Sequence, residues 1–432
     1  MPEADARPAA SRFRWTICAL LFFATTINYV DRQILSLIKE ILDAELGWSA
    51  TEFGLVNSAF QGAYGISLLG FGWLIDRLGT KAGYTLSIIA WSIAALAHAA
   101  VGSVAGFLSA RIALGLGEGG NFPSAIKAIA RWFPRHERAF ATSVFNSGTN
   151  VGAVIAPAIV PAVALAWGWQ SAFVLAGVAG FIWLVFWWRL YTDPHASTRV
   201  SAAELAEIER DAPPVGHATP IPWARLLRYR QTWSFIVAKF MTDPVWWFFL
   251  IWLPDLFKKV YGLEIKDSWT KLVAIYAIVT VLSIAGGWIT GYLYNRGWSL
   301  NRARKSGMLL FAVCVVPVAM ATKVDAWPAV LLIALAAAAH QAWSATLFTT
   351  VSDLFPESAV ASVTGIGGFA GAIGGMLFPI ACGMTLDHFR AAGNEAAAYT
   401  ILLTVCAFAY LVTFMIHHLL VPRLEPIPTD PA

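Results

Sequence analysis

The chain has 432 residues, of which 58% are hydrophobic and 13% are charged, and its mean hydropathy is +0.63. Because a soluble domain is about 25% charged, this composition excludes a single globule in water, and its apolar content excludes a disordered chain. The formal net charge of +4 is too small for this length to indicate a nucleic-acid-binding protein.

Apolar windows of about 20 residues, the length that crosses roughly 30 Å of hydrocarbon as a helix, follow one another along the chain. They predict an all-α, polytopic membrane protein whose twelve transmembrane helices form two six-helix bundles. The predicted spans are residues 15–37, 53–75, 82–102, 105–127, 140–162, 171–191, 231–257, 270–294, 306–323, 327–352, 360–385 and 397–420. Their even number places both termini on the same side of the membrane.

The basic residues of the loops are divided unevenly between the two sides. Nineteen Lys and Arg residues lie in segments predicted to share a side with the termini, and seven lie in the opposite loops. Since cytoplasmic loops carry the excess of Lys and Arg, this asymmetry predicts cytoplasmic N- and C-termini. The four cysteines fall inside spans without paired spacing, which argues against disulfides and against a metal site.

One long hydrophilic stretch interrupts the series of spans. It covers residues 192–230 and separates an N-terminal six-helix bundle (1–191) from a C-terminal six-helix bundle with its tail (231–432). Within this cytoplasmic linker, Ser201 and Glu204 have the spacing of a capping box. They predict a short amphipathic helix lying on the cytoplasmic surface.

The two predicted bundles echo each other in sequence. Three matches share an offset of 222 residues: Phe133-Pro134 with Phe355-Pro356, Gly152 with Gly374, and Pro157 with Pro379. A weaker echo links residues 72–77 with residues 291–296. Two similar halves around a site at the bilayer midplane are typical of alternating-access transporters, so the repeat predicts pseudo-symmetric bundles and transport.

Several short runs carry a resemblance to known transporters. Residues 72–81, Gly-Trp-Leu-Ile-Asp-Arg-Leu-Gly-Thr-Lys, resemble the signature of the major facilitator superfamily between spans two and three. The runs 28–32, 111–123, 131–138 and 145–148 resemble the anion:cation symporter family. Ala339-His340-Gln341-Ala342, Ser352-Asp353-Leu354-Phe355 and Asp243-Pro244-Val245-Trp246 are similar to runs in hexuronate transporters. The resemblance covers nearly the whole chain and implies a monomeric, proton-coupled transporter of the cell inner membrane.

Ionisable residues inside the spans are the first candidates for a site, because each costs roughly 2.5 kcal/mol or more at the bilayer centre unless it is compensated. Asp31 and Arg32 are about 100° apart on their helix and point in different directions. Arg111 and Glu118 are two turns apart and share one face. Asp31, Arg111 and Glu118 are therefore expected to form an acid–base–acid cluster between spans one and four.

Two interpretations of this cluster remain open. Movement of Arg111 between two acids would change their protonation and couple transport to protons, whereas a fixed salt bridge would only hold the helices together. The family resemblance implies that Asp31 and Glu118 carry the coupling and that Arg32 holds the substrate carboxylate. A guanidinium suits that role because it meets a carboxylate through two parallel hydrogen bonds.

Polar and aromatic residues in four spans are candidates for sugar contacts. Tyr29 and Tyr64 offer a hydroxyl and an aromatic face, although each is equally compatible with ordinary packing. On span five, the candidates are Asn146, Thr149 and Asn150, which recur at three- and four-residue steps. On span ten, the candidates are His340, Gln341 and Trp343. A hydrogen bond between helices is the alternative for the histidine. Some sugar-acid relatives have Gln at the position of Thr149, which leaves the sugar preference open.

Two further pairs are assigned to structure and gating. Lys239 and Asp243 are four residues apart on span seven and are expected to pair, with a structural role favoured over substrate contact. Asp76 is expected to cap the N-terminus of a helix from the other half. Arg77 is expected to pair with a nearby acid, so that the two residues close the cytoplasmic side.

These observations predict proton-coupled import of a sugar acid, such as galacturonate or glucuronate, by rocker-switch alternating access. Protons are the only cofactor expected, and the partners expected are a small organic anion and the lipid bilayer. The alternatives are transport of an aldonate, aldarate, dicarboxylate or aromatic carboxylate by the same mechanism, and a transporter-like sensor. An enzyme is not expected, since the sequence contains no His-Glu-x-x-His, Gly-x-Ser-x-Gly or paired-Asp catalytic pattern.

Overall fold

The computed structural model describes residues 11–210 and 221–427, and within that part of the chain the regular structure is helical, without strands. A few side chains inside the helices, among them those of Asp76 and Asn295, also lie outside the description. The predicted fold class, an all-helical polytopic protein, is confirmed.

The helices fall into two groups joined by a linker. The first half contains α1 (Phe13–Leu37), α2 (Lys39–Leu46), α3 (Ala50–Leu78), α4 (Thr80–His98), α5 (Val104–Glu118), α6 (Asn121–Trp132), α7 (Arg135–Trp167) and α8 (Trp169–Leu190). The linker contains η1 (Pro194–Ala196), α9 (Ala202–Glu209) and α10 (Trp223–Leu226). The second half contains α11 (Arg230–Tyr261), α12 (Ile265–Asn295), α13 (Leu300–Val315), η2 (Val316–Lys323), α14 (Ala326–Leu354), α15 (Glu357–Ala391) and α16 (Glu395–Leu420).

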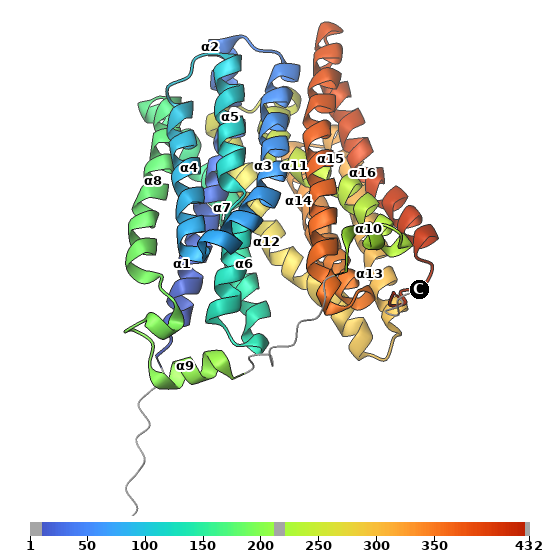
Figure 1. Ribbon diagram of the computed structural model, residues 1–432. Helices are drawn as coiled ribbons and strands as arrows, with labels where there is room; N and C mark the ends of the chain where they lie inside the picture. The colour runs from blue at the N-terminus through green and yellow to red at the C-terminus, as the bar shows by residue number, and fades with distance from the viewer. Residues whose placement is uncertain (1–10, 211–220, 428–432) are drawn as a thin grey trace, which may run out of the picture.

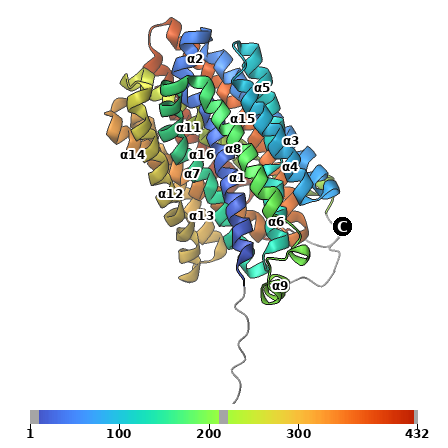
Figure 2. The ribbon, with the colours of Figure 1, turned by 90° about the vertical axis from the view of Figure 1, so that its left-hand side faces the viewer.

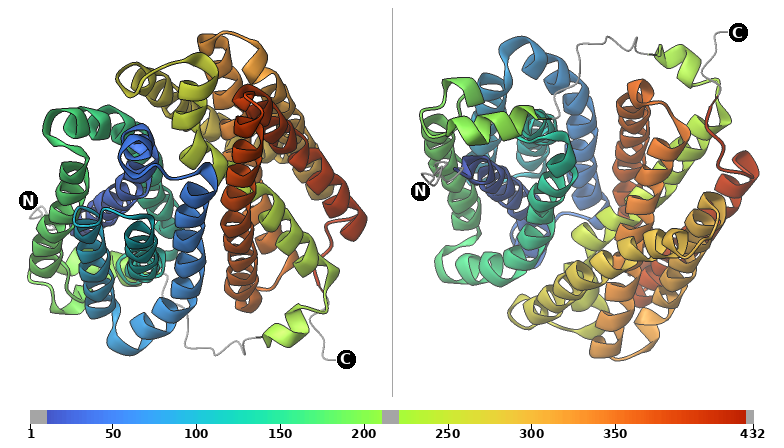
Figure 3. Two further views of the ribbon diagram at one scale, coloured as in Figure 1. Left: turned by 90° about the horizontal axis from the view of Figure 1, so that it is seen from above. Right: turned by 90° about the horizontal axis from the view of Figure 1, so that it is seen from below.

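The two halves stand side by side as separate bundles (Figure 1). The views from above and below show the blue-to-green helices on one side and the yellow-to-red helices on the other (Figure 3). The beginning of α1, the linker helix α9 and the end of the described chain lie toward one end of the molecule, called the termini end below (Figures 1 and 2). The opposite end, where α2 lies, is called the outer end.

Eight segments are long and apolar enough to cross a membrane by length and composition. They are α1, most of α7, α8, α11, α13 with η2, most of α14, most of α15, and α16. The remaining predicted spans correspond to α3, α4, α5 with α6, and α12. A multi-pass membrane protein is therefore supported, while the number of twelve spans stays a prediction.

The predicted span 105–127 is not one helix, because α5 ends at Glu118 and α6 begins at Asn121. The hydroxyl of Ser67 on α3 donates to the carbonyl of Leu116, and the hydroxyl of Ser87 on α4 donates to the carbonyl of Gly117 at 2.6 Å. Those two carbonyls would otherwise accept the next helical N–H groups, so the neighbouring helices compete with the ladder at the break. The prediction of an uninterrupted helix is wrong here.

The linker helix α9 begins as predicted but is fixed in an unexpected way. Ser201 Oγ accepts a hydrogen bond from the N–H of Glu204 at 3.2 Å, as an N-cap should. The Glu204 carboxylate does not complete the capping box; it accepts from the N–H groups of Phe13 (3.1 Å) and Arg14 (3.0 Å). A linker carboxylate thus caps the first helix, which attaches α9 to the first half.

Candidate functional site

A buried ion pair joins α1 to α5 near the middle of the molecule. Nε of Arg32 donates to Oε2 of Glu118 at 2.6 Å, and the two side chains are 4% and 0% exposed. The sequence predicts Arg111 as the base between Asp31 and Glu118; in the conformation described, the base that is hydrogen-bonded to Glu118 is Arg32, and Arg111 is its neighbour. The difference arises because a seven-residue spacing defines a shared face of α5 but not which arginine of a neighbouring helix reaches that face first.

Four aromatic rings surround the guanidinium of Arg32. Its Cζ lies 4.4 Å from the ring centroid of Tyr64, 5.0 Å from that of Tyr29, 5.3 Å from that of Phe60 and 5.7 Å from that of Trp247. Aromatic faces at these distances attract a cation. The cage therefore holds Arg32 in place by electrostatic contact with both halves, since Trp247 belongs to α11.

Two of these rings are absent from the sequence-based site. Phe60 lies four residues before Tyr64 and shares its face of α3, so helical spacing was the signal available for it. Trp247 comes from the second half and follows the acidic-Pro-x-Trp run by one residue. Nothing in its own sequence environment indicates that it reaches an arginine on α1.

Asp31 and Arg111 lie in the same buried region without pairing. Nη2 of Arg111 is 3.5 Å from the backbone carbonyl of Arg32, and its guanidinium is 5.7 Å from the ring of Phe60. Both carboxylate oxygens of Asp31 are buried and have no hydrogen-bond partner among the described residues. The predicted acid–base–acid cluster is thus present as a group of neighbours, but its one formed ion pair uses Arg32.

A small cavity of about 20 Å³ adjoins this group. Gln33, Gln61 and Arg111 line it, and each has a buried side-chain nitrogen or oxygen without a partner. A space of this size holds about one water molecule, which would satisfy such groups. The two glutamines were missed by the sequence reasoning because a lone Gln in an apolar span carries no charge or spacing signal.

The candidates on α14 lie in the packing of the second half. Nδ1 of His340 is 2.5 Å from the hydroxyl of Tyr410, and its ring stacks on Trp246 at 5.6 Å. Trp343 is fully buried and meets the edge of Tyr410 at 5.6 Å. Gln341 is half-buried. For His340, the alternative of a hydrogen bond between helices is the arrangement present here.

Lys239 and Asp243 form the expected pair within α11, with Nζ 2.7 Å from Oδ2. The ammonium also lies 4.6 Å from the ring centroid of Phe348 on α14. At Gly371 on α15, an added Cβ would lie 2.2 Å from Oδ2 of Asp243. The pair is therefore packed between three helices of the second half, α11, α14 and α15.

The three α7 candidates are not brought to Arg32 by any contact among the described residues. Asn146 is exposed, Asn150 is half-buried and Thr149 is 7% exposed. The face of α7 that meets α1 is marked instead by Gly148, where an added Cβ would lie 2.5 Å from the carbonyl of Phe22. The close approach of these two backbones requires glycine there, and the asparagines lie away from that contact.

Of the predicted latch at the termini end, the side chain of Asp76 lies outside the described residues, and Arg77 is exposed. A comparable contact is found at the outer end. The carboxylate of Asp387, near the end of α15, accepts hydrogen bonds from the N–H groups of Ala50 (2.9 Å) and Thr51 (2.8 Å). It therefore caps the N-terminus of α3 from the other half.

Two ion pairs complete this contact, which we call the outer latch. Lys39 Nζ is 2.9 Å from Asp255, and Lys258 Nζ is 2.7 Å from Glu40. At this outer end Lys39, Glu40, Ala50 and Thr51 of the first half bond to Asp255, Lys258, Ile265 and Asp387 of the second half. The conformation is therefore closed toward the outer end.

Replacing Asp387 with Ala should weaken this closure. A helix cap of this kind contributes about 1–2 kcal/mol, so the open population is expected to rise about 5- to 30-fold. Ser36 is buried on the wall of a cavity of about 300 Å³ beside the latch, so a Ser36→Cys background reports opening through labelling by a membrane-impermeant maleimide. Glu209→Ala, at an exposed acid on α9, is the control. Unchanged labelling in the Asp387 variant would contradict the latch.

Comparison with known proteins agrees with this architecture. Residues 21–379 match the family model described as Major Facilitator Superfamily. The chain is 30% identical over 385 residues to the hexuronate transporter of Escherichia coli K12, covering 87% of this chain and 88% of that protein. It is 29% identical over 398 residues to the D-galactonate transporter of Escherichia coli O6:H1, covering 89% and 91% of the two chains.

A relative from another organism and a solved structure extend the comparison. The chain is 31% identical over 408 residues to a protein of Bacillus subtilis named as a probable galactarate/D-glucarate transporter, covering 89% and 88% of the two chains. The crystal structure of a bacterial homolog of the human lysosomal transporter Spinster, inward-facing and occupied, superimposes with a TM-score of 0.76 at 18% identity, covering 98% of this chain and 100% of that one. That likeness concerns the fold alone. The matched family and the relatives' names are those of transporters, not enzymes, and the chain belongs to the Major Facilitator Superfamily.

Proposed function

We propose that this protein imports a sugar acid together with protons, by alternating access across the cell inner membrane, with both termini in the cytoplasm. The observation that carries the proposal is the buried arginine Arg32, held between the two halves by aromatic rings and by one exchangeable carboxylate. The relatives named for hexuronate, galactonate and galactarate transport support a carboxylated sugar as the substrate. Hexuronates are the proposed class.

Arg32 is suited to bind the substrate carboxylate. Its Nε is occupied by Glu118, while its buried Nη2 has no hydrogen-bond partner among the described residues. A carboxylate that approaches this edge can accept two parallel hydrogen bonds from the guanidinium. The rings of Tyr29 and Tyr64 would then lie beside the sugar, where aromatic faces pack against C–H surfaces and hydroxyls can hydrogen-bond.

The same geometry suggests how protons are coupled. A substrate carboxylate that binds the free edge of Arg32 competes with Glu118 for the guanidinium, and once it displaces Glu118 it leaves a completely buried carboxylate without its cation. An uncompensated buried charge is costly, so displacement favours uptake of a proton by Glu118. Asp31, buried without a partner, is a second acid that can accept or release a proton as Arg111 moves.

The driving forces differ with the number of protons. One proton with a monoanion is electroneutral, so only the pH gradient contributes, at about 1.4 kcal/mol per pH unit. A second proton would add the membrane potential, at about 2.3 kcal/mol per 100 mV. Two buried acids beside one arginine are compatible with either number.

The outer latch fits the inward-facing stage of this cycle. Because the halves are joined at the outer end, the substrate site is closed from that side in the conformation described. Import requires the latch to open, the anion to reach Arg32, and the halves to rock so that the site opens toward the termini end. The three contacts of the latch, one cap and two ion pairs, can each break without unfolding a helix.

A competition assay tests the substrate class. Purified protein in liposomes, with a proton gradient directed inward, should take up labelled galacturonate. Unlabelled galacturonate and glucuronate should reduce this uptake most strongly. Galactonate, galactarate and an aromatic carboxylate form the rest of the panel. Aldonates or aldarates are the second candidate class, favoured by two of the relatives' names, and stronger competition by galactonate or galactarate would move the assignment there.

A further inference from the structure

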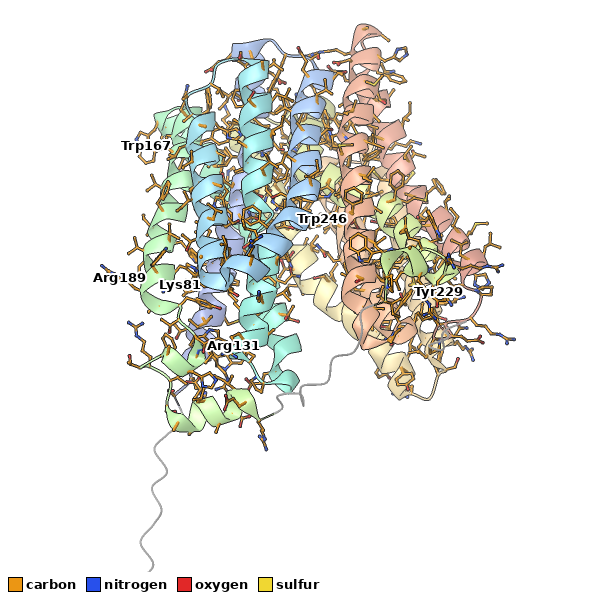
Figure 4. The ribbon with its side chains drawn as sticks, in the orientation of Figure 1. Lys81, Arg131, Trp167, Arg189, Tyr229 and Trp246 are labelled. Carbon is orange, nitrogen blue, oxygen red and sulfur yellow. The ribbon has the colours of Figure 1, made fainter. Side chains whose placement is uncertain are left out.

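A third cavity, of about 620 Å³, lies in the first half toward the termini end, and the transport site does not use it. It is formed by the beginning of α4, the end of α6 and the end of α8. Figure 4 shows Lys81 and Arg131 in this lower part of the first bundle, below the middle of the helices. The residues that give the cavity its character are Lys81, Lys127, Arg131, Trp188, Tyr191 and Asp193.

The cavity wall carries more positive than negative charge. Among the described side chains that line it, three are basic and one is a carboxylate, that of Asp193, which pairs with Arg131 at 2.7 Å. Lys81 Nζ donates to the carbonyl of Trp188 at 3.1 Å and lies 5.1 Å from its ring centroid, and no described carboxylate lies within ion-pair distance of it. Lys127 donates to the carbonyl of Ile75 at 3.2 Å. An anion is the ligand that this wall would attract.

The backbone adds to this preference. The cavity is also lined by residues 79–82, the first turn of α4, whose N-cap is Gly79. Glycine has no side chain to accept from the first N–H groups of the helix, and Gly79 has a positive φ of 82°. Those donors are therefore available to an anion beside the two lysines.

An apolar, outward-facing surface continues from the cavity along the same helices. On α4, Leu86 and Ile93 are 45% and 55% exposed; on α8, Val185 and Val178 are 49% and 41% exposed. In a membrane protein such side chains face acyl chains, and Trp188, 55% exposed, stands where this surface meets the basic cavity. A ligand with a negative head and apolar chains would contact both parts.

We propose that this cavity binds the phosphate headgroup of an anionic phospholipid from the leaflet at the termini end. The basic residues bind the phosphate, and the acyl chains follow the exposed faces of α4 and α8. Basic pockets between transmembrane helices at the cytoplasmic leaflet recognise such headgroups. The apolar surface favours a lipid over a free phosphate ion, and the proposal does not depend on which solute the protein transports.

The test uses full-length protein purified in detergent and phosphatidylglycerol labelled on an acyl chain, with labelled phosphatidylcholine as the neutral comparison. Wild-type protein is expected to bind phosphatidylglycerol more tightly, by fluorescence anisotropy. The Lys81→Gln/Lys127→Gln variant is expected to bind it about 30-fold more weakly, since each basic residue near an anionic surface contributes about 1 kcal/mol. Arg189→Gln, at an exposed residue outside the cavity lining, is the matched control and should bind like the wild type.

Further measurements keep the result decisive. If the double variant does not fold, Arg131→Gln at an exposed position should still weaken binding about fivefold. Equal binding of phosphatidylglycerol by the wild type and by a folded cavity variant would overturn the proposal. Inorganic phosphate that displaces the labelled lipid at submillimolar concentration would also overturn it, because the site would then belong to a free ion.

Discussion

Replacing Arg32 with Lys is expected to weaken sugar-acid binding by at least about 100-fold, although the positive charge is kept. A guanidinium offers a carboxylate two parallel donors, and each hydrogen bond to a charged group contributes about 1.5–3 kcal/mol. An ammonium offers a point charge, and it does not have the planar fork of donors that the guanidinium presents where it lies 4.4 Å from the ring centroid of Tyr64. Arg32→Gln removes the charge as well and should bind still more weakly.

The measurement is galacturonate binding to purified protein by calorimetry, followed by uptake into liposomes. Arg189→Lys makes the same chemical change at an exposed position near the end of α8 and should leave both readouts unchanged (Figure 4). Circular dichroism shows whether each variant keeps its helical content. A folded Arg32→Lys protein that binds and transports as well as the wild type would mean that the carboxylate is recognised elsewhere.

Replacing Glu118 with Gln is expected to abolish accumulation driven by a pH gradient while exchange of labelled for unlabelled substrate continues. Glutamine has nearly the same shape as glutamate, so it fits the same completely buried position. It has no proton to exchange and no charge to hold Arg32, so substrate binding no longer requires proton uptake. The halves can still rock with a bound anion, which is all that exchange requires.

Both assays use the same liposomes, with and without an inward pH gradient. Glu209→Gln removes an exposed carboxylate on α9, outside the site, and should retain accumulation. If Glu118→Gln still accumulates substrate against a gradient, the coupling acid is another group, and Asp31→Asn is the next variant to compare. Loss of exchange as well as accumulation would instead assign Glu118 to substrate binding.

The helical fold class is predictable from the lengths of the apolar runs. In a bilayer the backbone must satisfy its own hydrogen bonds, so an apolar run of this length can span it only as a helix. The break between α5 and α6 is different. It depends on the hydroxyls of Ser67 and Ser87, which approach from α3 and α4 and take two carbonyls of α5. Serine in a span is common, and which serine faces a neighbouring backbone is decided only when the helices pack.

In the candidate site, too, one part can be predicted from the sequence and another part depends on how the helices pack. Helical spacing predicts a cluster of Asp31, Arg111 and Glu118, since buried charges must find one another, and in the structure these three residues lie in one region together with Arg32. The choice of Arg32 over Arg111 as the partner of Glu118 depends on the distance between α1 and α5, which spacing along a helix does not contain. Asp387 illustrates the extreme case, because the N–H group of Ala50 that it caps is 337 residues away in sequence.

The outer end of α3 touches α15 through bare main chain. An added Cβ at Gly54 would lie 2.3 Å from the carbonyl of Pro379, and one at Gly383 would lie 2.4 Å from the carbonyl of Ala50. At these two positions the backbones meet directly, without a flexible side chain between them that could adjust its conformation. The contact is therefore expected to be either fully formed or broken. An alanine methyl group at either glycine would hold the two helices apart and prevent complete closure at the outer end. Closure therefore depends on the absence of a side chain at these two positions.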